Sequence, residues 1–190
     1  MGGHNSNEGL LFVSPFIHSD SQFDSNMALL FPQAPGSALS AIEQTLYPAN
    51  FDNSFGNVNQ LGRIARAVAD ATITCNNYFI NKVFEPLNDS FAYRFSVLPA
   101  WHANDLEYSF MNPSNPGAGV NVTLAVIMQL YFASFVTSGS SNPVSGGFLP
   151  DFASNGELTV QNLNSTLVGP VLDAAVNESK CDWWQKGNFI

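Results

Sequence analysis

The sequence predicts an α/β fold in which long helices pack against a β-sheet. Apolar residues follow a helical spacing over residues 59–84 and 122–136, and they alternate as in a strand over residues 91–97. The chain of 190 residues shows no internal repeat and no linker, and it is long enough to bury the core of one domain. We therefore expect residues 1–190 to belong to a single domain.

The first part of the chain is predicted to hold one strand and two short helices. The residues before Ser6 are typical of the end of a parallel strand, and Glu8 follows on a loop, where α/β enzymes place their chemistry. Helices are expected over residues 24–31 and 37–47. A serine near the start of the second helix is its expected cap, and both Ser37 and Ser40 are candidates.

A long amphipathic helix over residues 59–84 and a strand over residues 91–97 are predicted next. The apolar face of this helix consists of Leu61, Ile64, Ala65, Val68, Thr72, Cys75, Phe79 and Val83. Pro86 is expected to end the helix. The strand leads directly to the loop that carries His102. A histidine in this place is held by the strand, while the loop lets its ring reach a neighbouring nucleophile.

The last part of the chain is predicted to contain two helices and a short strand. The expected elements are a helix over residues 122–136, a loop over 138–152, a strand over 157–161 and a helix over 178–186. Gly139 lies just past the first of these helices and is typical of a carboxyl-terminal cap. Trp183 and Trp184 are expected to pack beside Cys181.

Composition argues against several kinds of partner. The net charge of −9, from 6 basic and 15 acidic residues, leaves no basic patch for nucleic acid. The longest apolar runs, such as residues 124–135, are too short to span a membrane. No metal site is expected, because His4 and Glu8 lie on a turn with only His18 as a further candidate ligand. No cofactor is expected either.

Sequons and cysteines bear on the cellular compartment. No signal peptide is recognised at Met1, but four N-x-S/T sequons favour a secreted glycoprotein whose targeting segment lies outside these residues. The sequons are at Asn88, Asn121, Asn164 and Asn177. Cys75 and Cys181 lack the spacing of a redox motif and are too few for a zinc site. Counting alone leaves both a disulfide and two buried free thiols open.

Two turns in the sequence resemble those of a known family. The segment GHNSNEGLLF, from Gly3 to Phe12, fits the pattern G-x-N-x-x-E-G-x-x-F. The segment HANDLEYSF, from His102 to Phe110, is close to the pattern H-G-x-[DE]-[IL]-x-[YF]-x-F. They are similar to the acid turn and the histidine turn of the type-B carboxylesterases, α/β-hydrolases that include the cholinesterases and secreted fungal lipases. One departure is Ala103, where many relatives have glycine.

The resemblance implies the carboxyl-terminal third of an α/β-hydrolase, with an incomplete sheet and packed helices. Glu8 and His102 correspond to the acid and the base of a Ser-Glu-His triad. No G-x-S-x-G elbow occurs in the sequence, so we expect the nucleophile-bearing amino-terminal portion to be absent and this chain alone to be inactive. The implied substrate of the full-length protein is a hydrophobic carboxylic ester. Leu98, Trp101 and Phe110 near the histidine turn agree with such a substrate, and a short-chain esterase and a lipase both remain open.

The same resemblance extends to the cysteines. The segments ADATITCNNYF and KCDWW look like the two halves of the carboxyl-terminal disulfide of cholinesterase-like members, which implies a Cys75–Cys181 bridge. Such a bridge would remove on the order of 4–5 kcal/mol of unfolded-chain entropy. The alternative to an enzyme is a non-catalytic binding or adhesion module, because one fold supports both. Retention of Glu8 and His102 favours the enzyme.

Overall fold

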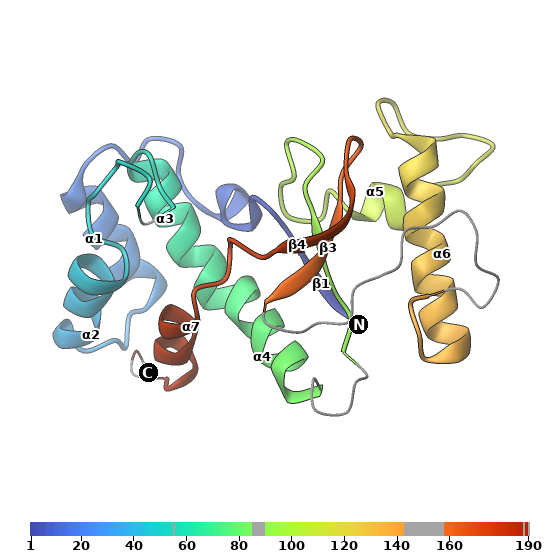
Figure 1. Cartoon of the computed structure of the whole chain (residues 1–190). Coiled ribbons are helices and arrows are strands. Elements are labelled where there is room, and N and C mark those ends of the chain that lie inside the picture. Colours follow the sequence, from blue (N-terminus) through green and yellow to red (C-terminus); the bar gives the residue numbers. More distant parts are fainter. Residues whose placement is uncertain (55, 85–89, 143–157, 188, 190) are drawn as a thin grey trace. The chain divides into compact units, whose positions relative to one another are not determined.

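The structure of the chain is a computed structural model that describes residues 1–54, 56–84, 90–142, 158–187 and 189 (Figure 1). It divides into two compact units. The sheet unit comprises Met1–Ser6 and Asn77–Ala174, and the helical unit comprises Asn7–Asn76 and Ala175–Ile190.

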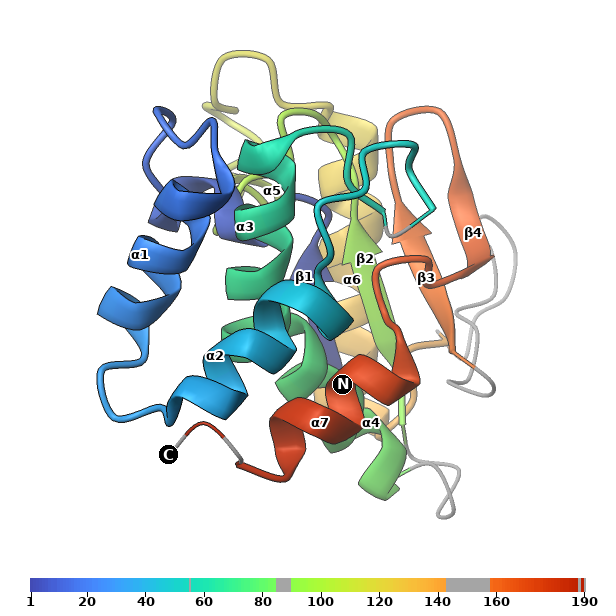
Figure 2. The ribbon, with the colours of Figure 1, turned by 90° about the vertical axis from the view of Figure 1, so that its left-hand side faces the viewer.

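The sheet unit contains a mixed four-stranded sheet in the order β1-β2-β3-β4 (Figure 2). Its strands are β1 (Gly2–Asn5), β2 (Ala92–Phe95), β3 (Thr159–Leu163) and β4 (Val168–Leu172). The first three run parallel although they are remote in sequence, and β4 runs antiparallel to β3. Parallel strands joined through helical segments are the mark of an α/β fold, so the predicted fold class is confirmed.

Helix α6 (Val122–Ser138) covers one face of this sheet (Figures 1 and 2). It begins at Asn121, whose side chain accepts a hydrogen bond from the Leu124 amide, and it ends at Gly139, which has a φ of 74°. The glycine cap agrees with the prediction, because this left-handed conformation favours glycine. The core that α6 shares with the rest of this unit consists of Phe91, Phe95, Tyr108, Met111, Leu124, Ala125, Met128, Tyr131 and Leu163.

The helical unit is built from short helices around the first part of the long predicted helix. Its elements are η1 (Glu8–Phe12), α1 (Asp20–Leu30), α2 (Gly36–Ala41), η2 (Ile42–Leu46), α3 (Gln60–Ala69), η3 (Asp70–Thr74) and α7 (Glu178–Gln185). Helix α4 (Cys75–Phe84) begins in this unit and continues into the sheet unit. A short helix, α5 (Leu106–Ser109), belongs to the sheet unit.

A buried arginine holds the helical unit together. Arg63 of α3 donates to the Tyr47 carbonyl at 2.6 Å, to the Asp20 carboxylate at 2.7 Å and to the Glu43 carbonyl at 3.0 Å. Its guanidinium also lies 3.8 Å from the centre of the Phe23 ring. Burial lowers the pKa of Arg63 and the Asp20 charge opposes that shift, as expected for a cation withdrawn from water and then paired. Such a hub links α1, η2 and α3.

Several element boundaries differ from the predictions. Helix α1 begins at Asp20, before the predicted start, because the Ser19 side chain accepts a hydrogen bond from the Gln22 amide. The predicted serine cap of the next helix is wrong: neither Ser37 nor Ser40 caps it. It begins after Pro35, which makes no side-chain cap. Proline fixes φ near the helical value and is well suited to a helix start.

The long helix and the sheet also differ in part from the prediction. Residues 70–74 form a π-helical turn between α3 and α4, where the buried Asp70 accepts a hydrogen bond from the Tyr47 hydroxyl at 2.7 Å. Strand β4 was not predicted, because Gly169 and Pro170 weaken its strand signal. Proline is tolerated there since β4 lies at the edge of the described sheet. Pro86, Glu157 and most of the predicted loop over residues 138–152 lie outside the described residues.

Candidate active site

The histidine turn follows β2 in the sheet unit. His102 is exposed, and the turn around it is closed by a hydrogen bond from the Trp101 amide to the Asn104 side chain at 2.8 Å. Ala100 and Ala103 have φ angles of 50° and 68°. Left-handed backbone costs a residue with a side chain on the order of 1 kcal/mol, which explains why a glycine suits the position of Ala103.

Asp105 ties this turn to two strands. Its carboxylate accepts hydrogen bonds from Asn5 Nδ2 at 3.0 Å and from the Tyr93 hydroxyl at 2.8 Å. Its carbonyl accepts from the Ser109 hydroxyl at 2.9 Å. The turn that carries His102 is therefore fixed to β1 and β2 at the edge where these parallel strands end. Asp105 therefore orients the residues around it.

The acid turn follows β1 and lies in the helical unit. Glu8 is the first residue of η1 and is buried, with 3% of its surface exposed. Gly9 packs so closely on α3 that an added Cβ atom would overlap the Ala65 carbonyl. The glycine after the acid therefore has a steric reason. Glu8 and His102 belong to different units, so the pairing of acid and base that the family resemblance implies stays a prediction.

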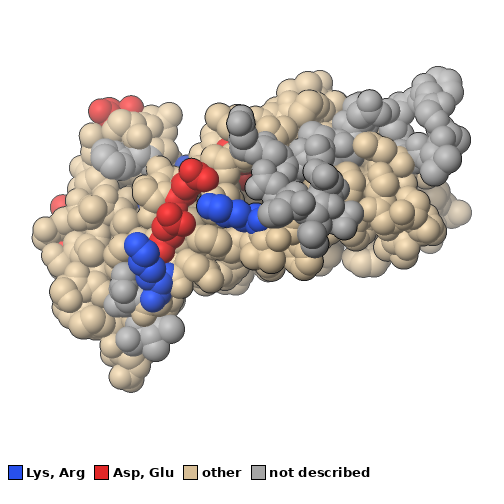
Figure 3. Space-filling model, turned by 60° about the horizontal axis from the view of Figure 1, so that its bottom comes forward, with Lys and Arg blue, Asp and Glu red and all other residues tan. Residues whose placement is uncertain are grey.

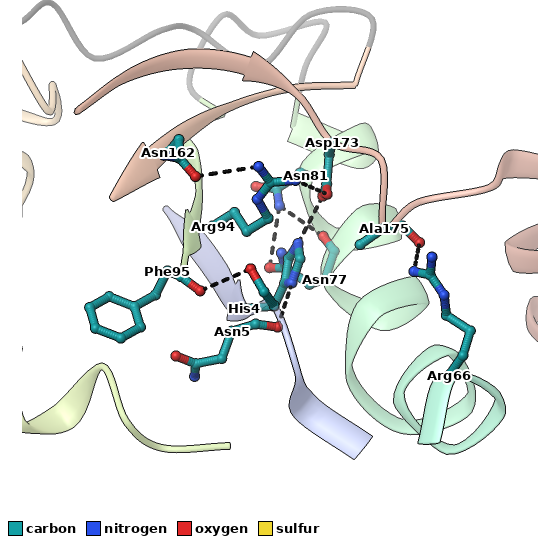
Figure 4. Close-up of polar contacts among 11 residues, drawn as sticks. His4, Asn5, Arg66, Asn77, Asn81, Arg94, Phe95, Asn162, Asp173 and Ala175 are labelled. Atoms are coloured by element: carbon teal, nitrogen blue, oxygen red, sulfur yellow. Dashed lines mark hydrogen bonds and ion pairs between the residues drawn. The ribbon is translucent and has the colours of Figure 1, made fainter. Parts of the chain in front are cut away.

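A buried polar row crosses one face of the sheet and was not predicted. His4, Arg94 and Asn162 are register partners on β1, β2 and β3. His4 Nε2 lies 2.8 Å from the Asp173 carboxylate, and Arg94 approaches the same carboxylate at 3.9 Å (Figure 4). Arg94 also donates to Asn162 at 3.3 Å. A lone histidine in a glycine-rich strand gives no sequence signal for a partner 169 residues away.

The two cysteines are joined in the helical unit. Cys75 and Cys181 form a disulfide with an S–S distance of 2.01 Å and a Cα–Cα distance of 4.9 Å, so no free thiol remains. Trp184 is buried and donates to the Tyr47 hydroxyl at 2.9 Å. Burial, followed by the Asp70 charge, raises the pKa of Tyr47 well above its usual value.

A buried lysine lies against the same tyrosine. Lys180 of α7 places its ammonium group 4.3 Å from the centre of the Tyr47 ring. Burial lowers the pKa of Lys180, and the Asp70 charge opposes this shift. The Tyr47 ring and the Asp70 charge therefore offset part of the cost of burying this amine.

Three sequon asparagines are described, and all have structural roles. Asn121 and Asn177 cap α6 and α7 through their side-chain oxygens, which accept from the Leu124 and Lys180 amides at 3.1 Å each. Asn164 Nδ2 instead donates to the Ser96 carbonyl at 2.6 Å, which ties the β3–β4 turn to the segment after β2. Asn88 lies outside the described residues.

Charged side chains occupy a small part of the face in Figure 3, and uncharged residues form most of it. In the described ranges, no group of three or more His, Cys, Asp or Glu side chains is placed to hold a metal ion. Within the same ranges, every helix is too short or too polar to cross a membrane.

Comparison with known proteins gives a structural similarity only. No protein-family model matches the chain, and no curated protein matches it in sequence. The crystal structure of Aspergillus niger EstA has a similar fold, with a TM-score of 0.77 at 20% sequence identity. The match covers 97% of this chain and 38% of that chain. The chain therefore shares the fold of a part of EstA and spans well under half of its length.

Proposed function

We propose that this chain is the carboxyl-terminal portion of a carboxylic ester hydrolase of the type-B carboxylesterase kind. It would supply Glu8 and His102 to a Ser-Glu-His triad. The observation that carries the proposal is the arrangement of two neighbouring parallel strands. Strands β1 and β2 end in register, Asn5 opposite Phe95, and the acid turn follows one while the histidine turn follows the other. Catalytic groups of α/β enzymes lie at the carboxyl ends of such strands.

Each residue has a defined task in the proposed reaction. His102 takes the proton from a serine hydroxyl as that oxygen attacks the ester carbonyl, and it then returns the proton to the leaving alcohol. Glu8 holds the imidazole in the required tautomer and stabilises its cation. The serine and the backbone donors for the oxyanion belong to a segment outside these 190 residues, because no G-x-S-x-G occurs among them.

The surroundings of His102 support a hydrophobic ester as substrate. Leu98 and Phe110, which flank the histidine in sequence, are 82% and 81% exposed, and Trp101 is 42% exposed. These apolar side chains are available to an acyl or alcohol group and are not part of the core. No cofactor and no nucleic acid enter this reaction.

We also propose that the full-length protein is secreted and glycosylated. A disulfide is compatible with an oxidising compartment, where such bonds form and persist. The sequons at Asn88, Asn121, Asn164 and Asn177 are the proposed acceptor sites.

The test compares this chain with the longer product of its gene. The transcript upstream of Met1 is read for an in-frame G-x-S-x-G, and both proteins are assayed with nitrophenyl acetate. We expect this chain alone to hydrolyse nitrophenyl acetate no faster than free imidazole does, because His102 has no nucleophile to activate. In the longer protein, His102→Ala should lower kcat by about 10⁴-fold or more, while the exposed His18→Ala should not.

Two outcomes contradict the proposal. Turnover by the chain alone that is lost in His102→Ala would place the nucleophile within these residues. A longer product that lacks any serine elbow would favour the non-catalytic binding module instead.

A further inference from the structure

Strand β1, which leads into the acid turn, has few side chains with which to pack. Its sequence is Gly2, Gly3, His4 and Asn5. The two glycines let other residues close over the backbone, since a Cβ atom on Gly3 would overlap the Tyr93 ring. In the described sheet, β1 pairs with β2 alone. Glycine also lowers strand propensity, so β1 needs a further source of order.

The two remaining side chains of β1 point to opposite faces of the sheet, and each meets a carboxylate. His4 contacts Asp173 on one face at 2.8 Å, and Asn5 donates to Asp105 on the other face at 3.0 Å. The Asp105 contact belongs to the histidine turn described above. The Asp173 contact comes from the segment that follows β4.

Asp173 is itself held firmly. It is buried, with 3% of its surface exposed, and its amide donates to the Leu158 carbonyl at 2.8 Å. Its carboxylate faces two basic groups, His4 at 2.8 Å and Arg94 at 3.9 Å (Figure 4). A buried carboxylate with such partners is costly to leave unpaired, so loss of either partner should destabilise this part of the sheet unit strongly.

We propose that Asp173 is a positioning residue that fixes the end of β1 through His4. The chain enters the acid turn three residues beyond Asn5, so this contact sets where that turn begins. The catalytic meaning of the inference rests on the proposed function, because the acid turn is what makes the position of β1 matter. The tie itself is a property of the sheet unit and is tested separately.

Hydrogen exchange of the 190-residue chain tests the tie. In Asp173→Ala, amides of residues 1–9 should exchange about 10- to 100-fold faster, because a charge-assisted hydrogen bond is lost. Asp173→Asn keeps an acceptor oxygen, so the amides of residues 1–9 should lose much less protection from exchange in this variant. The matched control is Asp182→Ala, which removes an exposed carboxylate in α7. Exchange within α6 serves as the internal reference.

Substitutions of His4, the partner of Asp173, distinguish loss of this contact from general destabilisation of the fold. His4→Gln retains a donor and should keep most of the protection, whereas His4→Leu should resemble Asp173→Ala. Equal rates in Asp173→Ala and in Asp182→Ala would overturn the proposal. So would equal acceleration in residues 1–9 and in α6, since that would be general destabilisation.

Positioning is tested in the longer, active protein that the proposed function requires. There, Asp173→Ala should lower kcat by about 10- to 100-fold, because misplaced catalytic groups react slowly, while KM changes less than about twofold. An unchanged kcat beside faster exchange in residues 1–9 would refute the positioning role. A longer protein that is inactive before any substitution would refute the proposed function and leave the exchange result standing.

Discussion

At the residue scale, the acid turn requires a glycine directly after Glu8. Gly9 follows Glu8 directly and lies against the Ala65 carbonyl of α3, where a Cβ atom has no room. A glycine after a glutamate is a weak signal in sequence, because many surface loops contain one. Only the packing of η1 on α3 explains why it is needed here.

Gly9→Ala should therefore lower the free energy of unfolding by about 1–3 kcal/mol, since backbone atoms of α3 must shift. Chemical denaturation followed by circular dichroism measures this change. Gly36→Ala is the matched control, because nothing lies within 4 Å of a Cβ atom at that position in α2. A loss as large in Gly36→Ala as in Gly9→Ala would contradict the steric explanation.

Tyr47 is the residue that should give the chain a pH dependence on the alkaline side. Its pKa is raised in the folded state by burial and then by the Asp70 charge, so folding favours the protonated form. The corresponding stability is fully present below the unfolded pKa of about 10 and is lost as pH rises beyond it. The free energy of unfolding should fall there by up to about 1.4 kcal/mol per pH unit.

Lys180 changes the pH dependence of the free energy of unfolding in the opposite direction. Its folded pKa is lowered by burial, so its contribution rises as pH approaches the unfolded value of about 10.5. Denaturation series from pH 8 to 11 on Tyr47→Phe and Lys180→Met separate the two. The fall should flatten in Tyr47→Phe and steepen in Lys180→Met, and identical slopes in all three proteins would rule this explanation out.

At the element scale, helix α6 combines a cap and a sequon in one residue. The Asn121 side-chain oxygen accepts from the Leu124 amide at 3.1 Å, while Thr123 completes the sequon and is exposed. Asn121→Ala removes the cap and the acceptor site together. Thr123→Ala removes the acceptor site and leaves the cap.

Asn121→Ala should cost about 1 kcal/mol of stability more than Thr123→Ala, because a side-chain cap contributes that much. Thermal unfolding of protein made without glycosylation measures this difference. In a secreting host, both variants should lose the same mass increment if Asn121 carries a glycan. Equal stabilities would mean that the cap contributes nothing.

Among the elements, the spacing of apolar residues predicted those whose position is set by packing of one apolar face. The helical spacing over residues 122–136 located α6 to within a few residues, and Gly139 marked its end. The π-helical turn at residues 70–74 was not predicted, because its buried Asp70 pairs with Tyr47, which follows η2 and is remote in sequence. The polar row from His4 to Asp173 was not predicted for the same reason. Contacts between distant polar residues leave no periodic trace in a sequence.

At the scale of the whole molecule, the chain exposes many large apolar side chains. On α6 alone, Val122, Val126 and Leu130 are about two-fifths exposed at 41%, 39% and 46%, and the helix carries no charged residue. Helices that are apolar all round are usually covered. The purified chain should therefore bind a hydrophobic dye and associate on a sizing column.

Substitution can test this source of association. Val126→Gln with Leu130→Gln should reduce dye binding and shift the sizing peak toward the monomer, whereas Thr137→Gln, at an exposed polar site of the same helix, should change neither. A sharp monomer peak for the unsubstituted chain, with a cooperative thermal transition, would show that its apolar surface is tolerated in water. It would also favour the binding-module alternative.

The disulfide has a consequence for limited proteolysis. Cys75 and Cys181 are 106 residues apart in sequence, and most of the sheet unit lies between them. A single cut anywhere in that stretch gives two pieces that stay covalently joined. A nicked chain should therefore run at full mass on a denaturing gel and separate only when a reductant is added.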